Sequence, residues 1–449
     1  MKGDFSRHTF QPGKNYSAVL LQQGRALLDA DFNEQGAIGL RLIRALAADL
    51  IGPHGGPGEG FRLTAIEGDP ASLAIAGGHY YVDGLLVDAN RPEPPRPVGG
   101  PEPEPGAGWT YWDQPWAYLD PEDPDDELPA RPPYVLCLKV WEDLVTAAED
   151  PEIRETALGS ALPDTAARSR VFWQVLPARG LDLSGVKTAD AVRERFAGWA
   201  GERTGPSSRL AARTERPART EEDPCIVAPD SRYRGQENQL YRVEVHGDRT
   251  FKWSRDNGSV TFPIAAVDGD WVTLAALGRD DKLDLHVGDA VEVADDASVA
   301  RGVPGKLLRV EDVDVPDRRV QLSGEPGPGA GRIAARHPLL RRWDHPRARD
   351  EGPGDGAVEI VEGEWLSLEN GVQVWFEPGG VYRTGDYWLI AARTLTGDVE
   401  WPRDDEGRPL LRPPAGVTFH YAPLAWAHGD GDPEDLRLTF EPLTRRPAP

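Results

Sequence analysis

The pattern of apolar and polar positions along the chain has two periods, and the shorter one dominates. Apolar and polar residues alternate in residues 241–245 and 250–253, as they do in half-buried β-strands. Residues 32–50 instead carry Leu40, Ile43 and other apolar residues at the 3–4 spacing of a helix. Additional leucines flank this stripe, so we expect the helix to be covered on more than one side.

Turn signals and changes of composition divide the chain into several parts. Glycine (49) and proline (42) are abundant, which favours short strands and loops over long helices. We therefore predict a mainly β, multidomain fold with short-stranded sandwich-like or barrel-like modules, one N-terminal helix and few other short helices. The predicted parts are an N-terminal segment (1–57) with the helix 32–50, a β-hairpin region (58–90), an acidic Pro/Trp-rich insertion (91–133), a central β-domain (134–264) with a linker (178–224), a small barrel-like module (265–325) and a C-terminal β-rich domain (326–449).

Two short-range signals make sharper predictions. The dipeptide Asp83-Gly84 stands between two apolar runs, a pattern typical of a tight β-hairpin. Thr188 is a good N-cap residue for a short helix in which Val192 and Phe196 share one face.

Charge and composition exclude several classes of partner. The chain has 50 basic and 74 acidic residues and a net charge of −24, so it repels nucleic acid and we expect no nucleic-acid partner. It has no run of 18 apolar residues and no apolar segment at its start, so we expect no membrane insertion and no signal peptide. We therefore expect synthesis in the cytoplasm, with exit from the cell by a route other than a signal peptide as an alternative. Its two cysteines, Cys137 and Cys225, predict neither a zinc site nor a disulfide framework.

The stretch DADFNE contains the weak candidate metal ligands Asp29, Asp31, Asn33 and Glu34. Oxygen-bearing side chains at alternate positions resemble the start of a calcium loop. If Asp29 is the first ligand, however, Glu34 occupies the position of the required glycine and Leu40 that of the bidentate glutamate. Asp31 followed by Glu34 also has the spacing of a capping box, which favours the start of a helix. An irregular metal site or an inter-subunit contact stays open as an alternative.

Five aromatic residues are crowded into the acidic insertion: Trp109, Tyr111, Trp112, Trp116 and Tyr118. Acidic, proline-rich loops rarely hold so many aromatic residues without burying some of them. One interpretation is a long loop held on its domain by these rings. The other is a surface for a protein partner or a glycan, because aromatic faces stack on sugars.

No constellation of residues predicts catalysis. Ser254, His246 and Asp256 suggest a triad, but no GxSxG motif surrounds the serine, and nearness in sequence does not assemble a triad. Acidic residues between 149 and 164 could include a glycosidase pair, although an exposed surface explains them better. We therefore predict no catalytic and no cofactor-binding residue, with calcium as the only candidate cofactor.

Several sequence blocks in a fixed order resemble an uncharacterised bacterial family. They include KGDFSR, QQGRALLDADFNEQ, YRGQENQLYRVEVH, FKWSRDNGSV and GDYWLIAAR. Members of that family occur near phage-tail-like particles and contractile injection systems. The resemblance implies a structural or accessory part of such a particle and no catalytic residues. Phe32 departs from the family's usual tryptophan, and Phe419 from an expected histidine before His420, which argues against a histidine metal site there.

Three hypotheses follow. The preferred one is a non-enzymatic component of a contractile injection particle, at the baseplate periphery, a fibre attachment or the particle surface, with other particle proteins and further copies of itself as partners. The alternative is a carbohydrate-binding or carbohydrate-cleaving, tailspike-like surface protein that uses the aromatic cluster together with Trp365, Trp375 and Trp388. The third is an adhesion module stabilised by calcium.

Overall fold

The fold is mainly β and consists of several small sheets with few helices, as the sequence predicts. The computed structural model describes residues 1–68, 71–92, 108–159, 163–215, 232–278, 281–345, 356–429 and 431–441. Its helices are α1 (Asp29–Ile51), α2 (Ala189–Thr204) and α3 (Asp296–Arg301). Short 3₁₀ turns lie at Pro12–Lys14, Pro151–Ile153, Thr156–Leu158, Asp281–Leu283 and Ala334–Arg336. Within the described residues, no helix is both long enough and apolar enough to cross a membrane.

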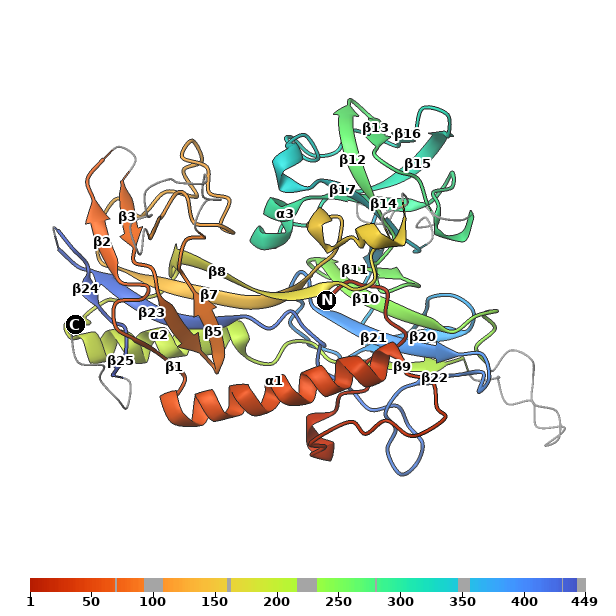
Figure 1. The fold of residues 1–449 in the computed structure, drawn as a ribbon, viewed down its shortest axis with the longest axis horizontal. Coiled ribbons are helices and arrows are strands. Elements are labelled where there is room, and N and C mark those ends of the chain that lie inside the picture. Colours follow the sequence, from red (N-terminus) through yellow and green to blue (C-terminus); the bar gives the residue numbers. More distant parts are fainter. Residues whose placement is uncertain are drawn as a thin grey trace.

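One half of the molecule, on the left in Figure 1, is built from three sheets around a shared core. One sheet has the strand order β24-β23-β7-β8, the second has the order β25-β1-β4-β5, and the third has the order β2-β3-β6. Trp173, Tyr80 and Phe61 are fully buried between these sheets. The strands are β1 (His54–Pro57), β2 (Leu63–Ile66), β3 (Ser72–Ile75), β4 (His79–Val82), β5 (Leu85–Asp88), β6 (Trp109–Thr110), β7 (Tyr134–Val145), β8 (Arg168–Pro177), β23 (His420–Ala427), β24 (Glu434–Asp435) and β25 (Thr439–Phe440).

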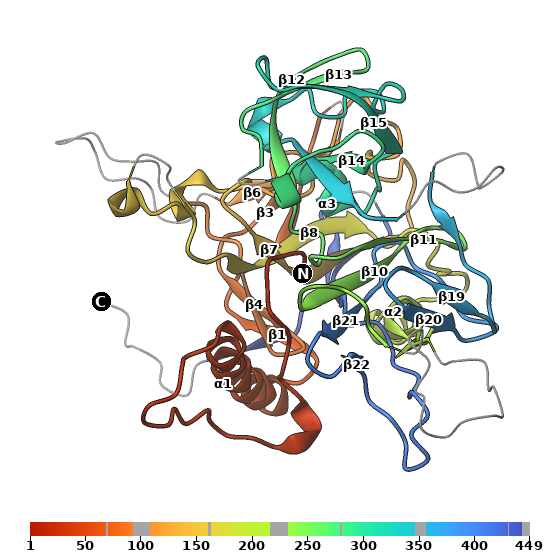
Figure 2. The same cartoon turned by 90° about the vertical axis from the view of Figure 1, so that its right-hand side faces the viewer.

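The other half combines a five-stranded sheet, a three-stranded sheet and a closed barrel. The five-stranded sheet has the order β18-β11-β10-β21-β22, and the three-stranded sheet has the order β19-β20-β9. Their strands are β9 (Leu210–Thr214), β10 (Gln239–Gly247), β11 (Thr250–Ser254), β18 (Val358–Glu359), β19 (Trp365–Ser367), β20 (Val372–Phe376), β21 (Tyr387–Arg393) and β22 (Asp398–Glu400). Figure 2 shows the barrel above these two sheets.

The barrel confirms the predicted barrel-like module but is longer than that module. It closes in the order β12-β13-β16-β15-β14-β17. Its strands are β12 (Thr261–Asp268), β13 (Trp271–Leu274), β14 (Ala290–Ala294), β15 (Leu307–Asp314), β16 (Arg319–Leu322) and β17 (Leu339–Trp343). Strand β12 begins before residue 265 and β17 lies after residue 325, and both are needed to close the ring because β17 pairs with β12 and β14.

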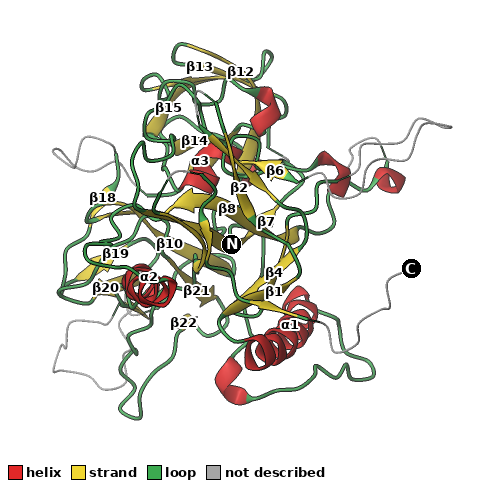
Figure 3. Ribbon diagram, turned by 90° about the vertical axis from the view of Figure 1, so that its left-hand side faces the viewer, coloured by secondary structure: helices red, strands yellow, loops and turns green. Residues whose placement is uncertain are grey.

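Segments that are far apart in the sequence share sheets in both halves. Strand β23 pairs with β7 although roughly 280 residues separate them, and β25 adds to β1 in parallel. Strand β21 lies between β10 and β22. The last part of the chain therefore completes sheets that earlier segments begin. Figure 3 shows the strands of these sheets in yellow and the few helices in red.

Both short-range predictions are confirmed. Strands β4 and β5 form a hairpin, with φ of 48° at Asp83 and 79° at Gly84, as a two-residue turn of this type requires. In α2, the Ala191 amide donates to the Thr188 hydroxyl at 3.4 Å, and Val192 and Phe196 are buried.

A candidate interaction surface

Helix α1 is held on the body of the protein by one face only. Ala30 and Ile38 are its only buried residues. Arg44 donates from Nη2 to Oε1 of Glu142 on β7 at 2.6 Å, and its backbone carbonyl packs against Gly84 at the tip of the hairpin. Figures 1 and 2 show α1 along the outer edge of the molecule, next to β1 and β4.

The opposite face of α1 is apolar and exposed, so the predicted cover on more than one side is wrong within this single chain. The six residues of this face recur at alternating spacings of four and three: Phe32, Gly36, Gly39, Ile43, Leu46 and Leu50. The four large side chains among them are 61–77% exposed. Residues at this spacing form one stripe along a helix, which we call the α1 seam.

The segment 16–28 extends the exposed apolar surface at the N-terminal end of α1. A hydrogen bond of 2.7 Å from the Val19 amide to Oε1 of Gln35 holds this segment beside the helix. Of the 25 large apolar side chains that are exposed in the described residues, 11 fall within residues 16–50. At roughly 100 Å² each, they present a surface on the order of 1,000 Å². A typical monomer has patches of about 300–600 Å², and a stable interface buries about 800 Å² per partner.

The DADFNE carboxylates serve the attachment of the N-terminal segment. Asp29 accepts hydrogen bonds from the amide and the hydroxyl of Ser6, at 2.9 and 2.6 Å. Partial burial raises the pKa of Asp29, but these bonds outweigh burial and bring it below its usual value. Glu34 accepts a hydrogen bond of 2.5 Å from the Thr9 hydroxyl. Among the described residues, no three acidic, histidine or cysteine side chains gather as a metal-binding group.

The expected capping box at Asp31 is wrong. Helix α1 begins at Asp29 with Leu28 as its N-cap, and the Leu28 side chain makes no capping hydrogen bond. Asp31 lies inside the first turn, and Glu34 is bound to Thr9 instead of reaching back along the helix. Carboxylates at a helix start still interact favourably with the helix dipole.

We predict that calcium does not stabilise the protein. Excess calcium and a chelator should both leave the melting temperature unchanged, because Asp29 and Glu34 are already bound to Ser6 and Thr9. Differential scanning fluorimetry with and without the two additives measures this. A rise with calcium that Asp29→Asn abolishes would contradict the assignment, since a ligand of the native state must stabilise it.

The aromatic residues of the insertion pack on the core. Tyr111 is 1% exposed and donates to the Asp126 carbonyl at 2.8 Å. Trp109, Trp112 and Trp116 are half-buried against the core of the three-sheet half. Tyr118 is also half-buried. The rings thus hold the loop on its domain and leave only part of their faces to solvent.

The triad candidates are not brought together. Strand pairing sets Ser254 opposite Arg242, whereas His246 lies four residues further along β10. The Ser254 hydroxyl accepts hydrogen bonds from the amides of Asp256 and Gly258, at 3.4 and 3.1 Å. It therefore holds the turn that leads from the five-stranded sheet to the barrel.

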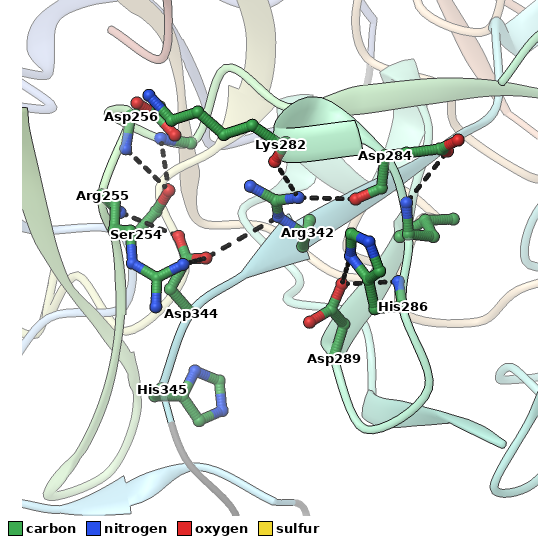
Figure 4. A network of polar contacts seen from close by, with 12 residues as sticks. Ser254, Arg255, Asp256, Lys282, Asp284, His286, Asp289, Arg342, Asp344 and His345 are labelled. Carbon is green, nitrogen blue, oxygen red and sulfur yellow. Dashed lines mark hydrogen bonds and ion pairs between the residues drawn. The ribbon is translucent and has the colours of Figure 1, made fainter. Parts of the chain in front are cut away.

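Figure 4 shows the polar contacts at this junction between the five-stranded sheet and the barrel. Asp344, at the end of β17, accepts from the amide of Arg255 at 2.8 Å and from its guanidinium at 3.3 Å. Arg342 donates to the carbonyls of Lys282 and Asp284, at 2.9 and 2.6 Å. The Arg255–Asp344 contacts join the two structural units, and the Arg342 contacts hold the barrel itself together, so both have a structural role.

A cluster of buried charges lies next to this junction. Glu244 of β10 is 3% exposed and contacts Arg242 Nε at 2.6 Å, Lys2 at 3.2 Å and Lys252 at 3.5 Å. Lys252 also contacts Glu292 of the barrel at 2.6 Å. Burial raises the pKa of Glu244, but the surrounding cations outweigh this and hold it well below its usual value. The cluster therefore ties the N-terminal segment, the five-stranded sheet and the barrel together.

A cavity of about 320 Å³ lies beside β7 and β8, and Lys139 is part of its lining. Within the described part of the chain, the Lys139 ammonium has no ion pair and no hydrogen bond, but it lies 5.0 Å from the centre of the Trp141 ring and 4.5 Å from that of Phe419. Burial lowers the pKa of Lys139 to about 8. A cation placed there without a carboxylate costs stability.

We predict that Lys139→Met stabilises the protein at pH 7 by about 1–2 kcal/mol. The lowered pKa corresponds to a cost of about 3 kcal/mol at most, and the two aromatic rings recover part of it. This cost is complete below pH 8 and disappears as the pH rises from about 8 to 10.5, because the ammonium then loses its proton in both states. Urea unfolding at pH 7 and pH 10.5 should show the gain shrinking, and an equal gain at both pH values would contradict the prediction.

Comparison with known proteins shows a family relationship that covers both halves of the fold. A model described as a family of unknown function, DUF6519, matches residues 1–197 and 191–442. The chain belongs to the DUF6519 family. This agrees with the resemblance of its sequence blocks to an uncharacterised family. Helix α1 and the barrel both lie within the parts that match this DUF6519 model. No curated protein and no solved structure matches the chain.

Proposed function

We propose that this DUF6519 protein is a non-enzymatic structural or accessory component of a phage-tail-like contractile injection particle, at the baseplate periphery, a fibre attachment or the particle surface. The observation that carries the proposal is the exposed apolar surface formed by residues 16–28 and the α1 seam. An apolar surface of this size is costly in water and gains stability when a protein partner covers it.

Two further observations support assembly over catalysis. The sequence blocks resemble a family whose members occur near such particles. The polar groups that suggested chemistry are used inside the fold: Ser254 holds a turn, and Asp29 and Glu34 fasten the N-terminal segment. Side chains bound in this way stabilise a module that other proteins can contact.

Co-purification tests the proposal. A tagged copy produced in its native cells should bring down sheath, tube or baseplate proteins. Leu46→Asp combined with Leu50→Asp should abolish this, because both residues are more than 60% exposed and their replacement leaves the core intact. A matched control is Leu395→Asp, since Leu395 is 97% exposed and lies outside α1, in the turn between β21 and β22. A wild-type protein that never co-purifies with particle proteins would overturn the proposal.

Carbohydrate binding is the second candidate function, and one arrangement of rings favours it. Trp365 and Trp375 are direct neighbours on β19 and β20, and both are half-buried, so part of each ring faces solvent. The Arg213 guanidinium lies 3.9 Å from the centre of the Trp365 ring. Binding to a panel of cell-wall and capsular glycans that Trp375→Ala abolishes would support this function, and absence of binding by the wild type would exclude it for those glycans.

A further inference from the structure

The α1 seam contains two glycines that have no structural reason within this chain. A Cβ added at Gly36 or at Gly39 would meet no other atom within 4 Å. Both residues lie inside a 23-residue helix, where each glycine costs about 1 kcal/mol relative to alanine. Glycines on an exposed helix face allow another backbone to approach closely.

The order of large and small residues along the seam is self-complementary. When a second α1 is placed antiparallel about a two-fold axis near residue 41, Phe32 faces Leu50 of the other helix. Gly36 then faces Leu46, and Gly39 faces Ile43. Each glycine therefore meets a large aliphatic side chain, so that large residues of one helix fill the spaces left by small residues of the other.

We propose that two copies of this protein associate through an antiparallel pair of α1 helices with these three layers. The inference rests on the proposed function in one respect, because it names a second copy as the partner of the same surface. In a dimer with two-fold symmetry, both copies contribute the same surface patch to the interface, and this symmetry is the commonest among soluble homo-oligomers. Figures 1 and 2 show α1 on the outer edge of the molecule, and the four large side chains of the seam are 61–77% exposed.

The segment 16–28 enlarges this contact. It lies beside the N-terminal half of α1, where the Val19 amide binds Gln35. In the antiparallel arrangement, the N-terminal half of one helix lies next to the C-terminal half of the other. The exposed leucines of the segment, Leu20, Leu21, Leu27 and Leu28, thereby come near the C-terminal end of the second α1. Together, helix and segment supply the area that a stable dimer needs.

The mass of the purified protein in solution gives the first test. Light scattering should report twice 49.1 kDa for the wild type. Ile43→Glu should give the monomer mass and remain folded by circular dichroism, since Ile43 is 65% exposed and contributes little to the core. Leu395→Glu is the control and should stay dimeric. A monomeric wild type at micromolar concentration would overturn the proposal and would leave a different protein as the occupant of the seam.

Disulfide trapping tests the antiparallel register. In a Cys225→Ser background, Gly36→Cys and Leu46→Cys are prepared as separate proteins. Under mild oxidation each should stay uncrosslinked alone, and an equal mixture should form a covalent dimer, because position 36 faces position 46 of the other copy. Crosslinking of each protein with itself would indicate parallel helices and contradict the register.

The two sets of experiments separate the two proposals. A dimer that never co-purifies with particle proteins would remove the proposed function and keep the helix pairing. A monomer that still co-purifies with sheath, tube or baseplate proteins would keep the proposed function and remove the pairing. The substitution Gly39→Leu provides a further check. It should weaken the dimer although it introduces no charge.

Discussion

Replacing Glu244 by glutamine is expected to lower the free energy of unfolding by about 3–5 kcal/mol, the usual cost of breaking a buried ion pair. The side chain balances Arg242, Lys2 and Lys252 at distances of 2.6–3.5 Å. Without its charge, Glu292 is the one carboxylate among the described residues that remains in ion-pair contact with this group of cations. Urea unfolding of purified wild type and Glu244→Gln at neutral pH measures the difference.

The matched control for this substitution is Glu400→Gln. Glu400 also contacts two arginines, Arg7 and Arg393, each at 3.1 Å, but its side chain is 41% exposed. Exposed ion pairs contribute about 0–1 kcal/mol because water and salt screen them. A similar small loss for both variants would contradict the assigned role of the buried cluster.

Gly84→Ala is expected to destabilise the attachment of α1 and to lower the free energy of unfolding by about 2–4 kcal/mol. Gly84 has a φ of 79°, which is unfavourable for alanine, and its added Cβ would overlap the carbonyl oxygen of Arg44 in α1. The helix must then move away from the hairpin. Hydrogen exchange of the α1 amides should accelerate more than exchange in β10, which is far from this contact.

Gly379→Ala separates the two causes. Gly379 has a φ of 76°, nearly that of Gly84, but a Cβ there would meet nothing within 4 Å. It should cost only the backbone strain of about 1–2 kcal/mol. Both variants could lose the same free energy of unfolding and leave the hydrogen exchange of the α1 amides unchanged. The close packing of α1 on Gly84 would then contribute nothing to stability. In Gly84→Ala, the displaced helix should also weaken any association through the α1 seam.

Features that depend on neighbouring residues could be predicted from the sequence. The Asp83-Gly84 hairpin and the start of α2 at Thr188 appear where local conformational preferences place them. Helix α1 appears from its 3–4 spacing, and its ends differ from the predicted ends by a few residues. The barrel could be recognised only in part, because its closing strand β17 lies after the predicted module and β12 begins before it.

Only part of the candidate surface could be predicted from the sequence. The apolar spacing of 32–50 predicts a helix, but it does not say which side the rest of the chain covers. Gly36 and Gly39, three residues apart within an apolar stripe, are a sequence signal for close helix packing. Only the structure reveals that this stripe faces outward and that the side with Ala30, Ile38 and Arg44 faces the body.

The sequence by itself determined the β-rich class, the positions of α1 and α2 and the tight hairpin, because each follows from short-range spacing and turn preferences. Tertiary structure alone decided which faces are buried. Alternation in β10 predicts one polar face in water, yet Arg242, Glu244 and His246 on that face are all buried. The N-terminal segment and the barrel cover them, with Lys2 and Glu292 among the compensating charges. The contact of Lys2 with Glu244 joins residues more than 200 positions apart, and that of Lys252 with Glu292 joins the five-stranded sheet to the barrel. No local pattern encodes such contacts.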